Sequence, residues 1–535
     1  MRSASFVTNR VQNQTLFEHQ RQNGRRDPLT QDARIDTFVG GMPLYENGVL
    51  VSNPLPPPPP PFQPWDLYSA FFYALDALFA YNASIGMGPT VSARNYYLFL
   101  ASLTHAYNWI YKQPLVSGVK DGIDWSIQHT LTTDADQLCW MNHVIITLMP
   151  YFIPTFNTQL LWEKERAALQ WNEETQQLEL NRIKEVAKWD TWFSAWQTWF
   201  SSRATDGSKE AAAVPTDLPN GSIFLEVTTT QDIASYPHPD KWTPLSLSGK
   251  QRRYLTAGWG NVRSTCLSAS DESTIKTNAG AEFSTPEERT DEIESLLTLT
   301  QALTDTQKLI AELWAGGPGT VSPPGMYMML WKQFCTAKPM LFSTLLLSGL
   351  QLSITLFEGS RLTWALKRQY MEARPIQEIR NRYKNDDIIL YDGTTVKGER
   401  WVPFQATNFV TPPFPDFPSG HSCFGKCFAN VMTNWFGASL PSVQITMSNA
   451  KLFSPTLTST LTTTFGTFPI AQGASEVQPS VEPSTPLTLT FTTWNEMAES
   501  SGVSRQYGGI HCASAHSGSL IVANEVCDKV KQKWF

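Results

Sequence analysis

Apolar residues recur every three or four positions along much of the chain, which is the spacing of an amphipathic helix. The pattern begins at Trp65, runs through WDLYSAFFYALDALFAYN and SARNYYLFLASLTHAYNWIY, and returns at 291–314 and at about 326–373. From Leu160 to Phe200 it predicts one long helix whose Trp-rich end packs into a core. The chain is therefore expected to be all-α, built from two units that resemble four-helix bundles.

Three segments depart from this helical pattern. Residues 1–64 are polar and end in the run Pro56–Pro61, which predicts an extended arm laid over the body. Residues 204–290 are rich in Pro, Gly, Ser and Thr and predict a loop-dominated excursion. Residues 442–492 alternate Thr with Leu, which favours short strands or a hairpin, and a capping-box pattern at Thr493–Glu496 then predicts a new helix.

These boundaries divide the chain into three parts. They are an N-terminal arm at 1–64, an N-terminal helical bundle with its loop-rich excursion at 65–290, and a C-terminal helical bundle at 291–535 that contains the excursion 442–492. At 535 residues the chain is long enough for a large buried core. The most hydrophobic run, Leu341–Phe357, is interrupted by serines, so it is predicted to be a buried core helix and not a membrane span.

Composition and charge narrow the classes of partner. The chain is 41% hydrophobic and 17% charged, as in a soluble globular protein, and its net charge of −7 comes with no basic run interleaved with aromatic residues. Nucleic acid is therefore not an expected partner. The seven Cys residues form no CxxC pair, so neither a disulfide framework nor a zinc site is indicated. The N-terminus lacks the apolar segment of a secretory signal, so we expect a cytoplasmic protein, or one exported without such a signal; the oligomeric state is left open.

Candidate chemistry begins at the end of the 326–373 helix. Lys367 and Arg374 are seven residues apart, which is two helical turns, so both are expected on one face of one helix. Pro375 disfavours helical geometry at Arg374 and places that guanidinium at the helix end. Two such cations can bind one anion, although a pair of this kind is also typical of an ordinary solvated surface.

The second candidate motif is Pro418-Ser419-Gly420-His421, which stands directly before the helical pattern SCFGKCFANVMTNWFG. A helix N-terminus offers free backbone N–H groups and the positive end of the helix dipole to an anion. Gly420 would let the backbone approach closely, and the Ser419 hydroxyl adds a donor. His421 would then lie beside the anion, where an imidazole can exchange protons near neutral pH.

The third motif is Ser504-Arg505-Gln506-Tyr507-Gly508-Gly509-Ile510-His511. One continuous helix would place Arg505 and His511 on different faces. A helix that ends near Arg505, a turn at the paired glycines and a new helix near His511 would direct both side chains into one pocket. An ordinary loop with a buried core histidine is the alternative interpretation of this octapeptide taken alone.

Together the three motifs gather three cationic side chains, a helix N-terminus, a hydroxyl and two imidazoles. This set of groups suits a tetrahedral or trigonal-bipyramidal oxyanion such as phosphate or vanadate. The residue types alone do not distinguish these two ligands.

At these residues the chain resembles the vanadium-dependent haloperoxidases, which share their pocket with the type 2 phosphatidic acid phosphatase superfamily. The resemblance also takes in GPTVSARNYYLFLASLTHAYNWI, PDKWTPL, GKQRRYLTAGWG and IAELWAGGPGTVSPPG, so it covers roughly residues 66–525 with gaps. It implies an all-helical enzyme with vanadate as cofactor, which oxidises halide with hydrogen peroxide to hypohalous acid and so halogenates a small organic substrate. Vanadium would act as a Lewis acid, so no haem or redox partner is implied.

The resemblance also assigns roles to the pocket residues. His511 would be bonded to vanadium, His421 would be the acid–base residue and Lys367 would polarise the bound oxidant. The remaining contacts to vanadate oxygens would come from Lys367, Arg374, Ser419, the Gly420 amide and Arg505. Trp364 and Phe414 match the aromatic positions of the fungal chloroperoxidase branch, which favours chloride or bromide, although both can equally be plain pocket walls.

Two positions depart from the family pattern. Where the fungal branch has an Asp after its AEFWA-like stretch, this chain has Gly317, so the carboxylate that orients the arginine is missing. Four residues after His511 the family often has Asp, and here that residue is Ala515. Either change can lower vanadate affinity or activity, because the partners of a ligand fix its orientation.

Two other functions remain open at this point. One is an acid phosphatase of the same superfamily, with a phospho-histidine intermediate at His511 and with His421 protonating the leaving group. The other is a non-catalytic oxyanion-binding homologue that keeps the pocket and has lost turnover, which the two departures favour. Trp364, Phe414 and the resemblance outside the pocket favour the haloperoxidase.

Overall fold

The computed structural model describes residues 66–111, 131, 133–212, 239–247, 250–251 and 254–535, together with the short strand pairs at 45–46 and 49–50. The rest of the predicted arm 1–64, with the proline run Pro56–Pro61, lies outside the described residues. The described chain is mostly helical, with a few two-stranded antiparallel sheets, so the predicted all-α class is confirmed.

The helices and strands have the following bounds. The helices are α3 (Leu67–Ser84), α4 (Pro89–Tyr111), α5 (Asp134–Phe152), α6 (Gln159–Leu169), α7 (Glu173–Val186), α8 (Trp189–Arg203), α9 (Ser208–Ala212), α10 (Ala269–Gly280), α11 (Pro286–Gln301), α12 (Asp305–Leu313), α13 (Ser322–Ala337), α14 (Phe342–Tyr370), α15 (Pro375–Arg382), α16 (Gly420–Phe436), α17 (Ala450–Phe453), α18 (Trp494–Tyr507) and α19 (Ala513–Trp534). The strands are β1 (Tyr45–Glu46), β2 (Val49–Leu50), β3 (Ser246–Leu247), β4 (Lys250–Gln251), β5 (Asp387–Ile389), β6 (Thr395–Lys397), β7 (Gln444–Met447), β8 (Leu461–Thr464), β9 (Thr467–Ile470) and β10 (Leu487–Thr490).

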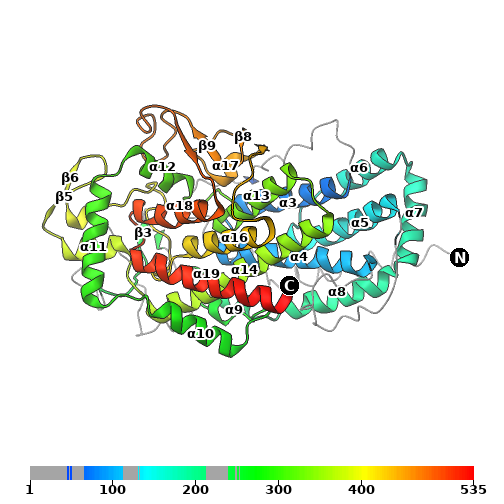
Figure 1. Ribbon diagram of the computed structural model, residues 1–535, viewed down its shortest axis with the longest axis horizontal. Coiled ribbons are helices and arrows are strands. Elements are labelled where there is room, and N and C mark those ends of the chain that lie inside the picture. Colours follow the sequence, from blue (N-terminus) through cyan, green and yellow to red (C-terminus); the bar gives the residue numbers. More distant parts are fainter. Residues whose placement is uncertain are drawn as a thin grey trace.

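Helix α14 is the central element of the molecule. It packs against α4 from the N-terminal half of the chain and against α16 and α19 from the C-terminal half, all running along the long axis (Figure 1). Most of its residues are buried, which confirms the prediction that the Leu341–Phe357 run forms a core helix. A Cβ on Gly349 would lie 2.5 Å from the Trp331 ring, so α13 approaches α14 closely at that residue. Among the described helices, none combines the length and the apolar character that crossing a membrane requires.

The segment from Leu160 to Phe200 does not form one helix as predicted. It folds as α6, α7 and α8, which turn at Gln170 (φ 55°) and at Lys188 (φ 51°), both in the left-handed region. Neither residue is Gly or Pro, so the sequence gives no signal for the breaks. The Trp-rich part of α8 is buried against the bundle, as predicted, through Trp189, Trp192, Trp196 and Trp199.

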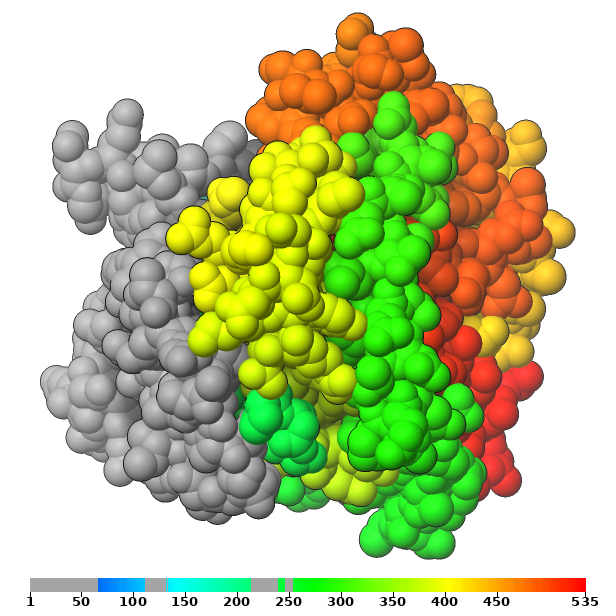
Figure 2. Space-filling model, turned by 90° about the vertical axis from the view of Figure 1, so that its left-hand side faces the viewer, coloured from blue at the N-terminus to red at the C-terminus, as the bar shows by residue number. Residues whose placement is uncertain are grey.

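The two excursions differ in how well the sequence predicts them. Helix α10 lies inside 204–290 and starts at a capping box between Ser268 and Asp271, so the prediction of a loop-dominated segment is wrong there. The excursion 442–492 contains the antiparallel pairs β7–β8 and β9–β10, as predicted. The predicted capping box of Thr493 and Glu496 starts α18. Figure 2 shows this excursion in orange above α11 (green) and the β5–β6 segment (yellow).

Candidate functional site

Lys367 and Arg374 come from two helices and not from one. Helix α14 ends at Tyr370, Met371 takes a left-handed conformation (φ 49°), and Arg374 is the N-cap residue of α15. The prediction of one shared helix face is therefore wrong, yet both side chains reach the same segment. Lys367 Nζ donates to the Asp416 carbonyl oxygen (2.9 Å), and Arg374 Nη1 is 4.0 Å from the Asp416 carboxylate.

The Pro-Ser-Gly-His motif starts helix α16, as predicted. Ser419 is the N-cap residue, and its hydroxyl accepts from the Ser422 amide at 3.4 Å. Gly420 is the first helical residue, and a Cβ there would lie 3.3 Å from the Trp364 ring. The absence of a side chain thus lets the ring and the helix N-terminus pack together at the site.

The Gly508–Gly509 turn brings Arg505 and His511 together in the way that the sequence predicts. Helix α18 ends at Tyr507, Gly509 takes φ 67°, and α19 begins at Ala513. The Ile510 amide donates to the Arg505 carbonyl oxygen (3.0 Å) and closes the turn. Both side chains are buried and both line the same cavity.

His511 is held at both ring nitrogens. Its Nδ1 donates to the Asp416 carboxylate, and its Nε2 is 3.1 Å from Arg374 Nη1. Since a carboxylate only accepts hydrogen bonds, the neutral imidazole carries its proton on Nδ1 and keeps its lone pair on Nε2. That lone pair is the group needed to bond a metal centre or to attack phosphorus.

Asp416 is itself fixed from behind by Arg289 of α11. Arg289 Nη2 donates to Asp416 Oδ2 (2.9 Å), and its Nε donates to Glu378 (2.8 Å). Neither Asp416 nor Arg289 is among the site residues predicted from the sequence. A signal existed for Asp416, because it is the one charged residue in the otherwise apolar run PPFPDFP. No comparable signal marks Arg289, which stands among the acidic residues of an exposed helix start.

His421 and Arg505 share one backbone acceptor. The Ala315 carbonyl oxygen lies 3.2 Å from His421 Nε2 and 3.1 Å from Arg505 Nη1. It stands in the stretch where the family pattern has an Asp and this chain has Gly317. Because a carbonyl oxygen only accepts, His421 carries a proton on Nε2, and the neutral ring has its basic lone pair on Nδ1.

Several buried N–H groups at the site have no hydrogen-bond partner among the described residues. They are Arg374 Nη2, Arg505 Nε and Arg505 Nη2, in side chains that are each 1% exposed. Lys367 donates two of its three N–H groups to the carbonyl oxygens of Pro415 (2.7 Å) and Asp416. Buried donors are almost always paired in folded proteins, so these groups indicate a site for an anionic ligand.

Burial sets the protonation states. It lowers the pKa of His511 and of His421 well below the ordinary 6.5, with Arg374 and Arg505 respectively adding to the effect. Burial also lowers the pKa of Arg374 to about 10 and that of Arg505 to about 9, so both stay cationic at neutral pH. Although burial opposes it, the cationic surroundings hold the pKa of Asp416 below its usual range. The site therefore combines fixed positive charge with neutral imidazoles.

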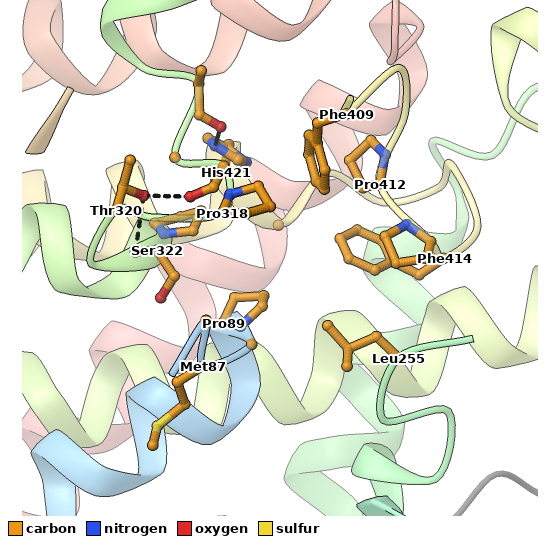
Figure 3. Close-up of a pocket in the computed structure, with 18 of the residues that line it drawn as sticks. Met87, Pro89, Leu255, Pro318, Thr320, Ser322, Phe409, Pro412, Phe414 and His421 are labelled. Atoms are coloured by element: carbon orange, nitrogen blue, oxygen red, sulfur yellow. Dashed lines mark hydrogen bonds between the residues drawn. The ribbon is translucent and has the colours of Figure 1, made fainter. Parts of the chain in front are cut away.

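A cavity of about 210 Å³ leads to this site (Figure 3). Its lining includes Gly420, His421, Arg505 and His511, whereas Lys367, Arg374 and Ser419 are not part of it. Trp364 and Phe414, predicted as halide-pocket residues, both line it, with ring centroids 4.8 Å apart. The Trp364 Nε1–H donates to the Leu255 carbonyl oxygen (3.0 Å), which fixes the indole against the wall.

Part of the chain matches a known family model, and its fold is similar to that of solved structures. Residues 349–534 match the family model described as the VCPO second helical-bundle domain. This region holds each of the three motifs. No curated protein matches the chain significantly by sequence.

The fold is similar to solved bacterial structures. A vanadium-dependent chloroperoxidase in its holo form gives a TM-score of 0.57 at 14% sequence identity, covering 85% of this chain and 95% of that one. The apo form gives the same score and identity and covers 84% and 95%. A vanadium-dependent iodoperoxidase also gives 0.57 at 14% identity and covers 88% and 97%. The chain therefore has the fold of the vanadium-dependent haloperoxidases, with the second helical bundle of that family in residues 349–534.

Proposed function

We propose that this chain is a vanadate-dependent haloperoxidase, which uses hydrogen peroxide to oxidise halide to hypohalous acid. The observation that carries the proposal is the set of unpartnered N–H groups of Arg374 and Arg505 beside His511, whose Nδ1 is bound to Asp416. The similarity in fold to a chloroperoxidase and an iodoperoxidase supports the same class of reaction.

The residues present fit a vanadate ion. Arg374 and Arg505 offer unused N–H groups, Lys367 offers its third, and the N-terminus of α16 offers the Gly420 amide beside the Ser419 hydroxyl. His511 would be the one protein ligand to the metal, through Nε2. When bound, vanadium supplies a Lewis acid that activates hydrogen peroxide without changing its own oxidation state.

The chain's own groups then manage charge and protons. Arg374 and Arg505 hold the negative oxygens in a water-poor setting, where charge-assisted hydrogen bonds are strongest. His421 accepts and returns a proton at Nδ1, because its Nε2 is bound to the Ala315 carbonyl oxygen. Burial and the neighbouring Arg374 lower the pKa of Lys367 well below its usual range, and its third N–H is the donor that remains for the bound oxidant. Its Nζ lies 5.7 Å from the Trp364 ring centroid and 5.1 Å from that of Phe414, the wall along which halide would approach.

The test is halogenation of monochlorodimedone by the purified protein with peroxide and chloride, bromide or iodide, with and without orthovanadate. Activity is expected only with vanadate and is expected to disappear in His511→Ala. If p-nitrophenyl phosphate is cleaved instead and vanadate inhibits the cleavage, the protein is a phosphatase acting through His511. If both assays are silent while vanadate still binds, the site is non-catalytic.

A further inference from the structure

The cavity beside the oxyanion site contains a hydroxyl that nothing in the described chain explains. Ser322 lines the cavity and is 6% exposed, and its Oγ has no hydrogen-bond partner among the described residues. Two other lining residues have hydroxyls that are already used. Ser84 Oγ donates to the Tyr81 carbonyl oxygen (2.8 Å), and Thr320 Oγ1 donates to that of Gly317 (2.7 Å). Ser322 Oγ is therefore an unpartnered donor and acceptor that is buried in the wall of a largely apolar cavity.

The backbone of Ser322 is strained at the same place. Its φ of 60° lies in the left-handed region, which residues with a Cβ rarely adopt. Its amide donates to Thr320 Oγ1 (3.2 Å), and the residue then opens helix α13. Non-glycine residues in such conformations persist where the surrounding structure enforces them, often at ligand sites.

The cavity that Ser322 lines also reaches the proposed acid–base residue, because His421 belongs to the same lining. A Cβ placed on Gly316 would lie 3.1 Å from Pro323 Cγ and 3.2 Å from His421 Nε2. Pro323, the residue after Ser322, and His421 therefore both lie beside Gly316. A molecule bonded to Ser322 would thus lie in the cavity that His421 also lines.

The remaining walls are flat and apolar. Phe409, Pro412 and Phe414 form one side, and Met87, Pro89 and Leu255 lie across from them and below, with Ser322 above Pro89 (Figure 3). An apolar cavity of about 150 Å³ takes up benzene, and drug-sized ligands use pockets of roughly 300 Å³ or more. The volume of about 210 Å³ therefore suits a molecule of one or two rings.

We propose that this cavity binds a small aromatic molecule with one hydrogen-bonding group, of the phenol class, as the halogen acceptor. Its polar group bonds Ser322 Oγ, and its ring lies along the Phe409–Pro412–Phe414 wall. The inference rests on the proposed haloperoxidase function, which supplies hypohalous acid. A ring carbon gives an electron pair to the halogen and the halogen–oxygen bond breaks. The departing hydroxide takes the ring proton, so that the aryl halide and water are formed.

Binding is tested without turnover, by calorimetric titration of the full chain with phenol and, separately, with toluene, in the absence of peroxide and halide. Ser322→Ala removes the hydroxyl, and Ser322→Gly removes it while also suiting the positive φ. Both variants are expected to weaken phenol binding about 3- to 10-fold, the value of one ordinary hydrogen bond. Toluene binding should be unchanged. The matched control is Ser84→Ala, which alters a serine of the same cavity whose hydroxyl is already bonded.

Three results would overturn the inference: no binding of phenol, equal losses of phenol and toluene in the Ser322 variants, or an equal loss of phenol in Ser84→Ala. The proposed function is judged separately, by vanadate-dependent oxidation of iodide to triiodide, which needs no organic acceptor. If iodide is oxidised but phenol does not bind specifically, the acceptor site is ruled out and the haloperoxidase function stands. If phenol binds through Ser322 but iodide is not oxidised, the cavity is a phenol site and the proposed halogenation of the bound phenol is ruled out.

Discussion

Asp416 gives His511 the carboxylate partner that the family pattern places four residues after the histidine. Here that later position is Ala515, and the carboxylate comes from the loop before α16, backed by Arg289. The pairing fixes the tautomer that keeps the lone pair on Nε2, where it accepts from Arg374. A partner of this kind orients a metal-bound histidine and raises its basicity. The missing Asp at Ala515 is thus compensated from another part of the chain.

Asp416→Asn should lower the affinity for vanadate by about 10- to 100-fold, because the amide no longer selects the tautomer with its lone pair on Nε2. The measurement is a vanadate titration followed by calorimetry at several pH values, and the pH dependence of the affinity should change as well. Asp387→Asn, an exposed residue of β5, is the control. Unchanged affinity and pH dependence in Asp416→Asn would refute this positioning role.

Gly316→Ala should impair turnover, because the new methyl group would lie 3.2 Å from His421 Nε2. Gly319→Ala is the matched control. Both glycines have positive φ (58° and 85°), so backbone strain should destabilise both variants in the same way, by roughly 1 to 2 kcal/mol. Only the first Cβ meets the histidine, since the second has nothing within 4 Å. Steady-state kinetics should show a kcat loss in Gly316→Ala at least about tenfold larger, and equal losses would contradict the contact.

The sequence predicts the residues that line the proposed anion site better than the residues that hold them in place. Motif spacing identifies Arg505 and His511, because a glycine turn has a recognisable signature. The acceptor of His421 and Arg505 is a backbone carbonyl at Ala315, which no residue type can reveal. Arg289 reaches the site only through tertiary packing of α11, so its role also depends on the fold.

At the scale of elements, helical periodicity locates helices well and their breaks poorly. Left-handed residues at Gln170 and Met371 each end a helix, and the one at Lys188 directly precedes α8, although the apolar pattern continues across all three breaks. The break at Met371 separates Lys367 from Arg374, yet it leaves both near Asp416. Capping boxes are more informative, because the pairing of Thr493 with Glu496 fixes the start of α18 and hence the register of Arg505.

Helix α6 is tied to α5 and α7 through a buried carboxylate whose charge should make stability depend on pH. Glu165 accepts from Asn142 Nδ2 and Gln176 Nε2 (each 2.8 Å), and burial raises the pKa of Glu165 from 4.5 to about 7. The folded state thus holds the proton more tightly than the unfolded chain does. The resulting stabilisation is complete below pH 4.5 and is lost as the pH rises through about 7.

Glu165→Gln should remove this dependence. Relative to the variant, the original chain should lose up to about 3 kcal/mol of unfolding free energy between pH 4.5 and pH values above 7. Urea unfolding of both proteins across this range provides the measurement. Glu163→Gln, on the same helix but outside the buried network, is the control. Parallel pH profiles for Glu165→Gln and the original chain would contradict the assignment.

At the scale of the whole molecule, the site joins elements from distant parts of the chain. Its cationic and imidazole groups come from α14, the start of α15, α16, α18 and the turn before α19, while the cavity wall adds the α3–α4 turn. A ligand that binds this assembly stabilises the native state and not the unfolded chain. Fold class and the motif helices are predictable from sequence, whereas the wall at Met87 and Pro89 depends on how the two halves pack. The division into 1–64, 65–290 and 291–535 stays a prediction.

Orthovanadate should therefore raise the melting temperature of the protein. At a concentration about 100 times the dissociation constant, the stabilisation is about 2.7 kcal/mol. Arg505→Ala should abolish most of the shift at the same concentration, because two unpartnered N–H groups are lost from the site. Arg400→Ala, an exposed arginine, should keep it. Differential scanning calorimetry gives the comparison, and equal shifts in both variants would argue against Arg505 as a vanadate contact.

The Ala315 carbonyl orients His421 and Arg505 in a way that neither acid nor a substitution at that residue removes. An Asp in this place could gain a proton in acid or be lost by a single codon change, and the orientation of His421 and Arg505 would be lost with it. A peptide oxygen does neither, since every amino acid supplies the same atom and it does not titrate in water near neutrality. The two side chains are thus tied to a support that acidity and point substitution leave in place, provided that the surrounding glycine loop keeps its shape.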